Sequence, residues 1–71
     1  MNRESVSSSN LAAVGYETTT QTLEVEFNNG SIYQYYDVPL EIYQGLMNAA
    51  SHGKYFDANI KKGDYSFRRV S

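Results

Sequence analysis

The sequence contains no cysteine and no tryptophan, and it has only one proline and one histidine. Without cysteine the chain can form neither a disulfide nor a thiolate metal site, which is typical of a reducing compartment. No apolar run approaches the ~20 residues of a membrane span, and Met1–Ser5 lack the apolar core of a signal peptide. We therefore expect a soluble cytoplasmic protein with no membrane association.

Tyrosine is abundant, with seven in a chain of 71 residues. A chain of this length forms one small domain and buries only ~60–65% of the surface that its unfolded form exposes. Tyrosine gives such a core a large apolar area while its hydroxyl reaches the surface, and its ring is also a platform on which nucleobases stack. Composition leaves both uses open.

Charge is unevenly distributed along the chain. Residues 1–51 contain one basic and six acidic side chains, whereas residues 52–71 contain five basic and two acidic ones. The formal net charge is −2 at pH 7. A net-acidic protein does not attract nucleic acid through its overall field, but a basic C-terminal surface remains available for binding.

Residues 23–36 alternate apolar and polar side chains on both sides of Asn28-Asn29-Gly30, which predicts a β-hairpin. A two-residue loop would pair Phe27 with Ile32. A three-residue loop, with Gly30 left-handed in a bulge, would instead pair Phe27 with Ser31. We predict the three-residue loop, because only this register gathers all the large apolar side chains on one strand face. These side chains are Leu23, Val25, Phe27, Tyr33 and Tyr35.

The segment before the hairpin supplies another strand. Residues 11–16 are apolar and contain β-formers, so with the hairpin they predict a three-stranded antiparallel meander. Gly15 inside this strand indicates a bulge or a close approach of another backbone. Residues 1–8 are polar and serine-rich and are expected to be a flexible N-terminus, which leaves residues 9–71 as a single domain.

Two short helices are predicted after the hairpin. Pro39 takes the first helical position of one, and apolar residues then recur at helical spacing from Leu40 to Ala50. Ser51 caps a second helix that runs over residues 54–60, and Gly63 ends it in a left-handed conformation.

The fold class that follows is α+β, in which a three-stranded antiparallel β-meander is packed on one face by two short helices. Tyr33 and Tyr35 are expected to pack against the first helix rather than to stack on bases. The tail over residues 65–70 alternates weakly, and it is either an edge strand or an extended segment.

Residues with catalytic or metal-binding chemistry are few and separated. His52 has no second ligand nearby, and the alternating Glu24 and Glu26 indicate a solvent-facing strand rather than a catalytic pair. Neither a phosphate-binding loop nor a nucleophile elbow is present. We expect no enzymatic activity, no catalytic residue, no metal and no cofactor.

A nucleic-acid-binding surface is the main functional pattern in the C-terminal third. Four basic residues would form a phosphate-binding patch if they converged, with Phe67 between them and Tyr36 as an exposed aromatic. The four are Lys61, Lys62, Arg68 and Arg69. The competing interpretation is a solvated tail with charges at a helix end.

The order and spacing of these residues resemble the KTSC domain, a family named for its place at the C-terminus of some lysyl-tRNA synthetases. The matching motifs are Val14-Gly15-Tyr16, Leu23-x-Val25-x-Phe27-x-x-Gly30-x-x-Tyr33-x-Tyr35-x-x-Val38-Pro39, Ala50-Ser51-x-Gly53-x-Tyr55-Phe56, Ile60 and Tyr65-x-x-Arg68. The similarity runs from Val6 to Val70. In that family the domain also occurs alone as a small bacterial or phage protein, which this chain resembles.

The resemblance implies a role connected with RNA, because the domain is fused to a synthetase. Two hypotheses remain open. The first is a small non-enzymatic RNA-binding module that uses the basic and aromatic C-terminal surface. The second is a module for protein–protein interaction or self-association, in which a partner across the sheet completes a thin core.

Overall fold

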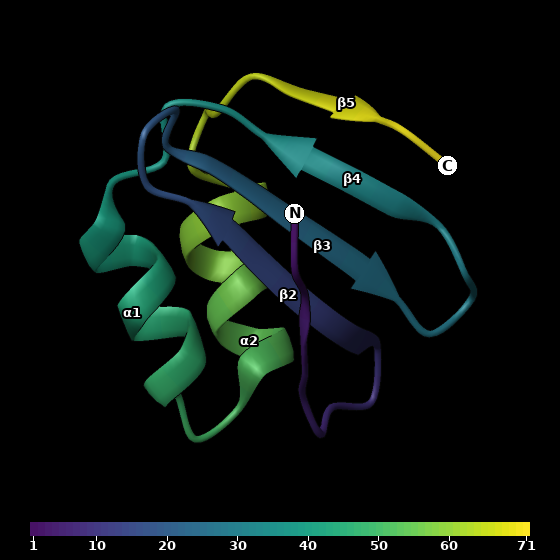
Figure 1. The fold of residues 1–71 in the computed structure, drawn as a ribbon. Helices are drawn as coiled ribbons and strands as arrows, with labels where there is room; N and C mark the ends of the chain where they lie inside the picture. Colours follow the sequence, from purple (N-terminus) through teal and green to yellow (C-terminus); the bar gives the residue numbers. More distant parts are fainter.

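Five antiparallel strands lie side by side in the order of the chain, and helices cover one face of the sheet (Figure 1). The computed structural model describes residues 1–71. The strands are β1 (Glu4–Ser5), β2 (Leu11–Glu17), β3 (Thr22–Phe27), β4 (Ile32–Tyr35) and β5 (Phe67–Arg69). The helical layer consists of α1 (Leu40–Asn48), α2 (His52–Phe56) and the π-helical turn η1 (Asp57–Lys61).

The predicted α+β class is confirmed, but the sheet has five strands instead of the three expected. The C-terminal tail supplies β5, which pairs antiparallel with β4 and is therefore an edge strand. At the other edge Glu4 pairs with Val14, and Ser5 pairs with Ala13. Residues 1–8, expected to be a flexible terminus, thus contribute strand β1 to the sheet.

The turn between β3 and β4 has the predicted three-residue form. Phe27 donates its amide to the Ser31 carbonyl at 2.9 Å, and Gly30 donates its amide to the Phe27 carbonyl at 2.9 Å. Gly30 has a φ of +91°, in the left-handed region. Val25 consequently lies opposite Tyr33, as the bulged register requires.

The apolar core lies between the sheet and the helical layer. Strand residues reach it from alternate positions, as they must when one sheet face is covered. Leu23 and Val25 of β3 are fully buried there. The buried core residues are Leu11, Val14, Leu23, Val25, Tyr35, Val38, Leu46, Phe56 and Ile60.

Helix α1 begins one residue later than predicted, because Pro39 is its N-cap rather than its first helical residue. Leu46 is fully buried, and Tyr43 packs beside it with its ring stacked on Tyr16 of β2 at 4.8 Å. Leu40 is exposed. The apolar stripe of α1 therefore faces the core from Ile42 onward rather than from Leu40.

Tyr35 is buried as predicted, but its aromatic partners are Phe56 of α2 and Phe67 of β5. Tyr33 is only partly buried and meets the ring of Phe27 edge-on at 5.7 Å. The ring expected from α1, Tyr43, is therefore not among the aromatic partners of either tyrosine. The reason is that α1 packs on the β2 side of the sheet, whereas α2 supplies the ring that covers β4.

The second helical segment ends differently from the prediction. Ser51 caps α2 as expected, since its hydroxyl accepts the Lys54 amide at 3.3 Å. Gly63, however, is not left-handed, and Asp64 takes that conformation with a φ of +62°. A Cβ at Gly63 would lie 2.6 Å from the Asn59 carbonyl oxygen. Glycine is therefore needed at this position for close packing, not for its backbone freedom.

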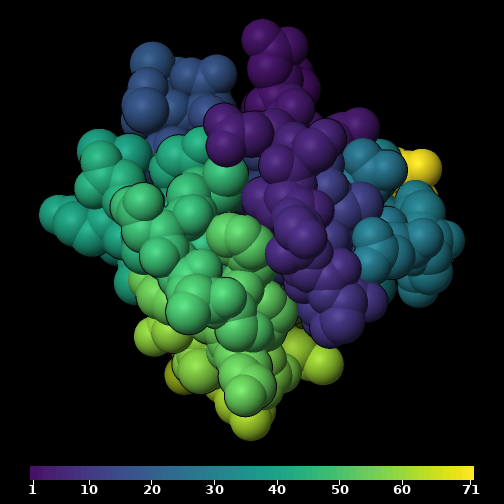
Figure 2. All heavy atoms as spheres, turned by 90° about the horizontal axis from the view of Figure 1, so that it is seen from below, coloured from purple at the N-terminus to yellow at the C-terminus, as the bar shows by residue number.

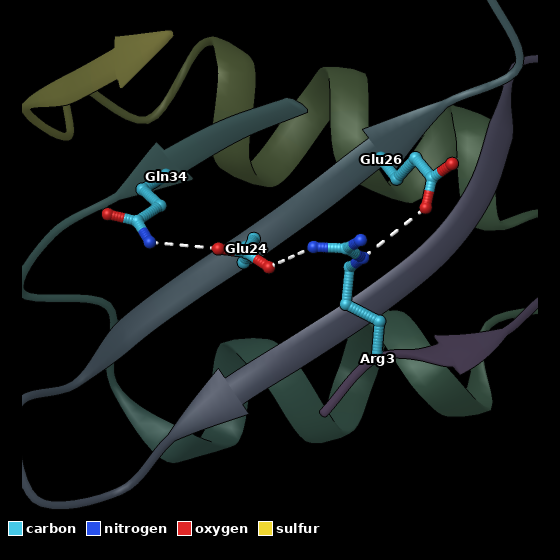
Figure 3. A network of polar contacts seen from close by, with 4 residues as sticks. All are labelled: Arg3, Glu24, Glu26 and Gln34. Carbon is cyan, nitrogen blue, oxygen red and sulfur yellow. Dashed lines mark hydrogen bonds and ion pairs between the residues drawn. The ribbon is translucent and has the colours of Figure 1, made fainter. Parts of the chain in front are cut away.

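The sheet face away from the helices carries a polar network centred on Glu24 (Figure 3). Arg3 forms an ion pair with Glu24 and a second one with Glu26 at 3.3 Å. Gln34 donates its amide to Glu24 at 2.8 Å. A Cβ at Gly15 would lie 2.6 Å from the backbone carbonyl oxygen of Asn2 and 3.2 Å from Arg3 Cγ, so the missing side chain at Gly15 makes room for the N-terminal segment. The close approach predicted at Gly15 is confirmed.

Glu24 has a lowered pKa within this network. Burial acts to raise the pKa, but hydrogen bonds from Gln34 and Arg3, together with the charge of Arg3, outweigh it and hold the pKa below its ordinary value. A carboxyl whose pKa is lowered in the folded state stabilises the fold above its unfolded pKa of about 4.3. That contribution is lost as the pH falls through the folded-state pKa.

We predict that Glu24→Gln reduces the acid sensitivity of the domain. At pH 7 the variant should be less stable than the parent, because Arg3 loses one of its two charged partners, and the difference should shrink as the pH falls below about 4.3. Denaturant unfolding between pH 7 and pH 3 measures this, with the exposed Glu4→Gln as the control. A stability difference that stays constant over this range would contradict the prediction.

We also predict that Gly30→Val destabilises the domain by more than about 1 kcal/mol, because a β-branched residue is strained at positive φ. No atom lies within 4 Å of a Cβ at Gly30, so the cost arises in the backbone alone. Gly30→Asn should cost less, since asparagine tolerates the left-handed region. Denaturant unfolding of both variants checks the order, and equal costs would show that the backbone conformation is not the cause.

Candidate functional site

A groove opens on the helical side of the sheet and has a volume of about 380 Å³. Five aromatic and four polar residues line it, and they are Phe27, Tyr33, Tyr35, Phe56, Phe67, Asn10, Ser31, Asp57 and Lys61. We call it the aromatic groove. A concave site with an apolar lining and a few polar groups is typical of ligand-binding sites.

The strand register places the aromatic rings in a row. Tyr35 of β4 lies directly opposite Phe67 of β5, and their ring centroids are 5.5 Å apart. Tyr33, two residues before Tyr35, points to the same face and lies 6.1 Å from Phe67. Phe56 closes the row from α2 at 5.6 Å from Tyr35.

The rings differ in their exposure to solvent. Tyr35 is only 6% exposed, whereas Phe67 is 60% exposed and Tyr33 is partly buried. Burial, helped by the neighbouring Tyr33, raises the pKa of Tyr35 above its ordinary value. Phe67 and Tyr33 are thus the rings that a ligand could contact without rearrangement of the core.

The π-helical turn η1 brings the charged groups to the groove. Lys62 donates its amide to the Asp57 carbonyl at 3.3 Å, a bond that spans five residues. This widened turn places both Asp57 and Lys61 in the groove lining. Single π turns inside helices occur frequently at functional sites.

The two lysines at the end of η1 have different environments. Lys62 forms an ion pair with Asp57 at 3.2 Å, whereas Lys61 forms no ion pair. Lys61 is exposed and lines the groove. Of the two, Lys61 is the cation that is available to an anionic ligand.

Asn10 reaches the groove because the N-terminal segment runs along the helical layer. A Cβ at Gly53 would lie 2.5 Å from Asn10 Oδ1, which shows how closely this segment approaches α2. Figure 2 shows the purple N-terminal segment lying against the green helical layer. The groove is therefore built from both ends of the chain as well as from the hairpin.

The six residues predicted as a nucleic-acid surface do not form one patch. Phe67 and Lys61 line the aromatic groove. Arg69 lies opposite Tyr33 and Arg68 lies opposite Gln34, so strand alternation sends the two arginines to opposite sheet faces. Lys62 is paired with Asp57.

Tyr36, expected to be an exposed aromatic, is half-buried on the polar face of the sheet and donates its hydroxyl to Gln34 at 3.1 Å. It is therefore separated from Phe67 by the thickness of the sheet. The expectation of one continuous basic and aromatic surface needs this correction. Its physical cause is the two-residue period of β4 and β5.

Sequence reasoning missed seven groove residues as members of a site: Phe27, Tyr33 and Tyr35, which it assigned to the core, together with Asn10, Ser31, Phe56 and Asp57. Asn10 and Ser31 are turn residues without a motif, and Phe56 was assigned to the core. Asp57 reaches the groove through a π turn, which ordinary helical periodicity does not predict.

Two further observations concern sites of other kinds. The structure contains no group of three or more His, Asp or Glu side chains arranged to hold a metal ion. None of its helices has the length and apolarity needed to cross a bilayer.

Comparison with known proteins gives a consistent family assignment. The KTSC domain family matches residues 7–65. The chain is similar to the lysine–tRNA ligase of Nostoc sp., with 48% identity over 61 residues that make up 86% of this chain and 11% of the ligase. It is also 40% identical to an uncharacterized protein of Stutzerimonas stutzeri, with 99% of each chain covered.

Structure comparison agrees with these sequence matches. The crystal structure of a KTSC domain protein from Yersinia pestis is similar, with a TM-score of 0.90 and 38% identity over 99% of this chain and 97% of that one. The chain spans about a tenth of the length of the lysine–tRNA ligases it matches, and nearly all of the small Stutzerimonas protein. The chain therefore belongs to the KTSC domain family, as its sequence motifs predicted.

Proposed function

We propose that this chain is a small non-enzymatic binding module that binds single-stranded RNA in the aromatic groove, in the cytoplasm. The observation that carries the proposal is the exposed ring of Phe67 beside the partly buried Tyr33 and the unpaired Lys61. Proteins that bind single strands combine exposed aromatic rings, on which bases stack, with nearby cations that contact phosphates.

The charge distribution supports an RNA site with few phosphate contacts. The chain carries a net charge of −2, so its overall field does not favour RNA. Lys61 lines the groove, and Arg69 lies on the same side of the sheet as Phe67. We therefore assign most of the affinity to stacking and only one or two phosphate contacts to these cations.

The relatives support an RNA ligand rather than another flat molecule. Three of the similar proteins are lysine–tRNA ligases, enzymes whose name specifies a tRNA substrate. They match this chain over 79–86% of its length. RNA binding by this domain would fit that setting, and the small stand-alone relatives would then carry the same module without the ligase.

We predict that an unstructured RNA oligonucleotide binds with a shallow salt dependence. A log–log slope of about −0.7 per phosphate contact gives a total near −1.4 for two contacts. Lys61→Ala should flatten the slope by about 0.7. Phe67→Ala should lower the affinity roughly 5- to 150-fold, which corresponds to about 1–3 kcal/mol per stacked base. Fluorescence anisotropy at several salt concentrations measures both effects.

Arg68→Ala is the matched control, because Arg68 lies beside Arg69 in the chain but on the opposite sheet face. It should change neither the affinity nor the slope. An equal effect of Arg68→Ala and Lys61→Ala would show nonspecific attraction instead of a groove, and no binding at low salt would refute the RNA proposal. Melting curves of the variants control for folding.

Self-association through β5 is the second candidate. The backbone of Val70 bonds to Ile32 and that of Ser66 bonds to Tyr36, so by ladder alternation the amides and carbonyls of Phe67 and Arg69 point away from β4. An open strand edge of this kind can pair with a second strand. A melting temperature that rises with protein concentration would support this candidate, because association stabilises the folded state.

A further inference from the structure

The aromatic groove contains one acidic side chain, Asp57, beside its row of rings. Asp57 follows Phe56 directly, and the ring of Phe56 packs edge-on against Tyr35 and Phe27. Because Asp57 lines the same groove as the exposed rings of Phe67 and Tyr33, a flat ligand stacked on these rings would have a carboxylate in the lining of its site. An acidic group is unfavourable beside phosphates, so its position calls for a ligand that offers hydrogen-bond donors there.

The nucleobases differ in the donors that they offer to a carboxylate. A carboxylate only accepts hydrogen bonds, and its two oxygens can accept two parallel ones. Guanine presents a ring N–H and an adjacent amino group on one edge, which match this pair of oxygens. Adenine and cytosine present an amino group next to an acceptor nitrogen, and uracil presents one N–H between two carbonyls.

From this geometry we propose that the aromatic groove selects an unpaired guanine, whose donor edge binds the Asp57 carboxylate while Lys61 contacts a neighbouring phosphate. This inference rests on the RNA-binding function proposed above and names the base that the same site prefers. Asp57 and Lys61 both project from the single turn η1, so one segment holds the group for the base and the group for the backbone.

The ion pair between Lys62 and Asp57 is compatible with this assignment. Lys62 Nζ lies 3.2 Å from Asp57 Oδ2; the Lys62 side chain is largely exposed and the Asp57 side chain is about half exposed. A carboxylate has about four acceptor positions, so Asp57 can keep this partner and still accept from a base. Removal of Lys62 should consequently leave the base preference in place.

The strongest competing occupant is an aromatic side chain of a partner protein. Such a ring would stack on Phe67 and Tyr33 equally well, but phenylalanine brings no donor for Asp57 and tyrosine brings only one. An aromatic peptide would therefore bind without any dependence on paired donors. This difference separates the two occupants experimentally.

The test uses four short uridine-rich RNA oligonucleotides that differ in one central base: guanine, adenine, cytosine or hypoxanthine. We expect the oligonucleotide with guanine to bind about five- to tenfold more tightly than those with adenine or cytosine. This factor lies at the low end of the discrimination usual for a bidentate base contact, because Asp57 is partly exposed to solvent. Hypoxanthine keeps the ring N–H but lacks the amino group, so it should bind with intermediate affinity.

Asp57→Asn is the central variant, since it replaces one acceptor oxygen by a donor at nearly constant shape. It should abolish the preference for guanine while retaining binding of the uridine background. Asp64→Asn and Lys62→Ala are the controls, because Asp64 does not line the groove and Lys62→Ala removes only the ion pair. Both controls should keep the preference of the parent.

The outcomes distinguish the two parts of the proposal, which are RNA binding in the groove and the preference for guanine. Equal affinity of the parent for all four oligonucleotides would overturn the guanine assignment while the RNA-binding function stands. A preference for guanine that persists in Asp57→Asn would overturn the role of Asp57. No binding of any oligonucleotide at low salt, together with binding of a phenylalanine-containing peptide, would overturn both parts and assign the groove to a protein partner.

Discussion

The register of the β3–β4 hairpin is the constraint on which the rest of the structure depends. Three residues in the turn, with Gly30 left-handed, set Val25 opposite Tyr33 and Leu23 opposite Tyr35. Because side chains alternate with a period of two, a shift by one residue would turn the β4 tyrosines away from the helices. The effect extends beyond the hairpin, since β4 is also the template on which β5 places Phe67. Core and groove are thus fixed by one turn.

The same alternation of side chains makes one face of the sheet apolar and the other polar. One face carries the apolar core and the row of rings, and the other carries the network of Arg3, Glu24 and Gln34 (Figure 3). The network holds β1 against the sheet without adding apolar surface. A chain of this size has little core to spare, so polar bonds on the uncovered face stabilise an edge that hydrophobic burial does not reach.

The sequence predicted the parts of the fold that have a strong local pattern. Alternation around Gly30, the capping residue Ser51 and the helical spacing around Leu46 each identified an element correctly. Strands β1 and β5 have only two or three residues, which is too short for a pattern, and their positions come from pairing with distant strands. The candidate site depended on such pairing. Arg68 and Arg69 are adjacent in the chain, and only the pairing of β5 with β4 separates them across the sheet.

The π-helical turn η1 makes the groove sensitive to the number of residues as well as to their identity. A π turn holds one more residue than an α turn, so it is equivalent to a single insertion in a regular helix. Removal of one residue from Asp57–Lys61 would restore α geometry, and every later residue would rotate by about 100° around the helix axis. Lys61 would then leave the groove, and the path to β5 would change direction. The number of residues in the segment of η1, rather than any particular side chain, would then decide whether a member of the family has this groove.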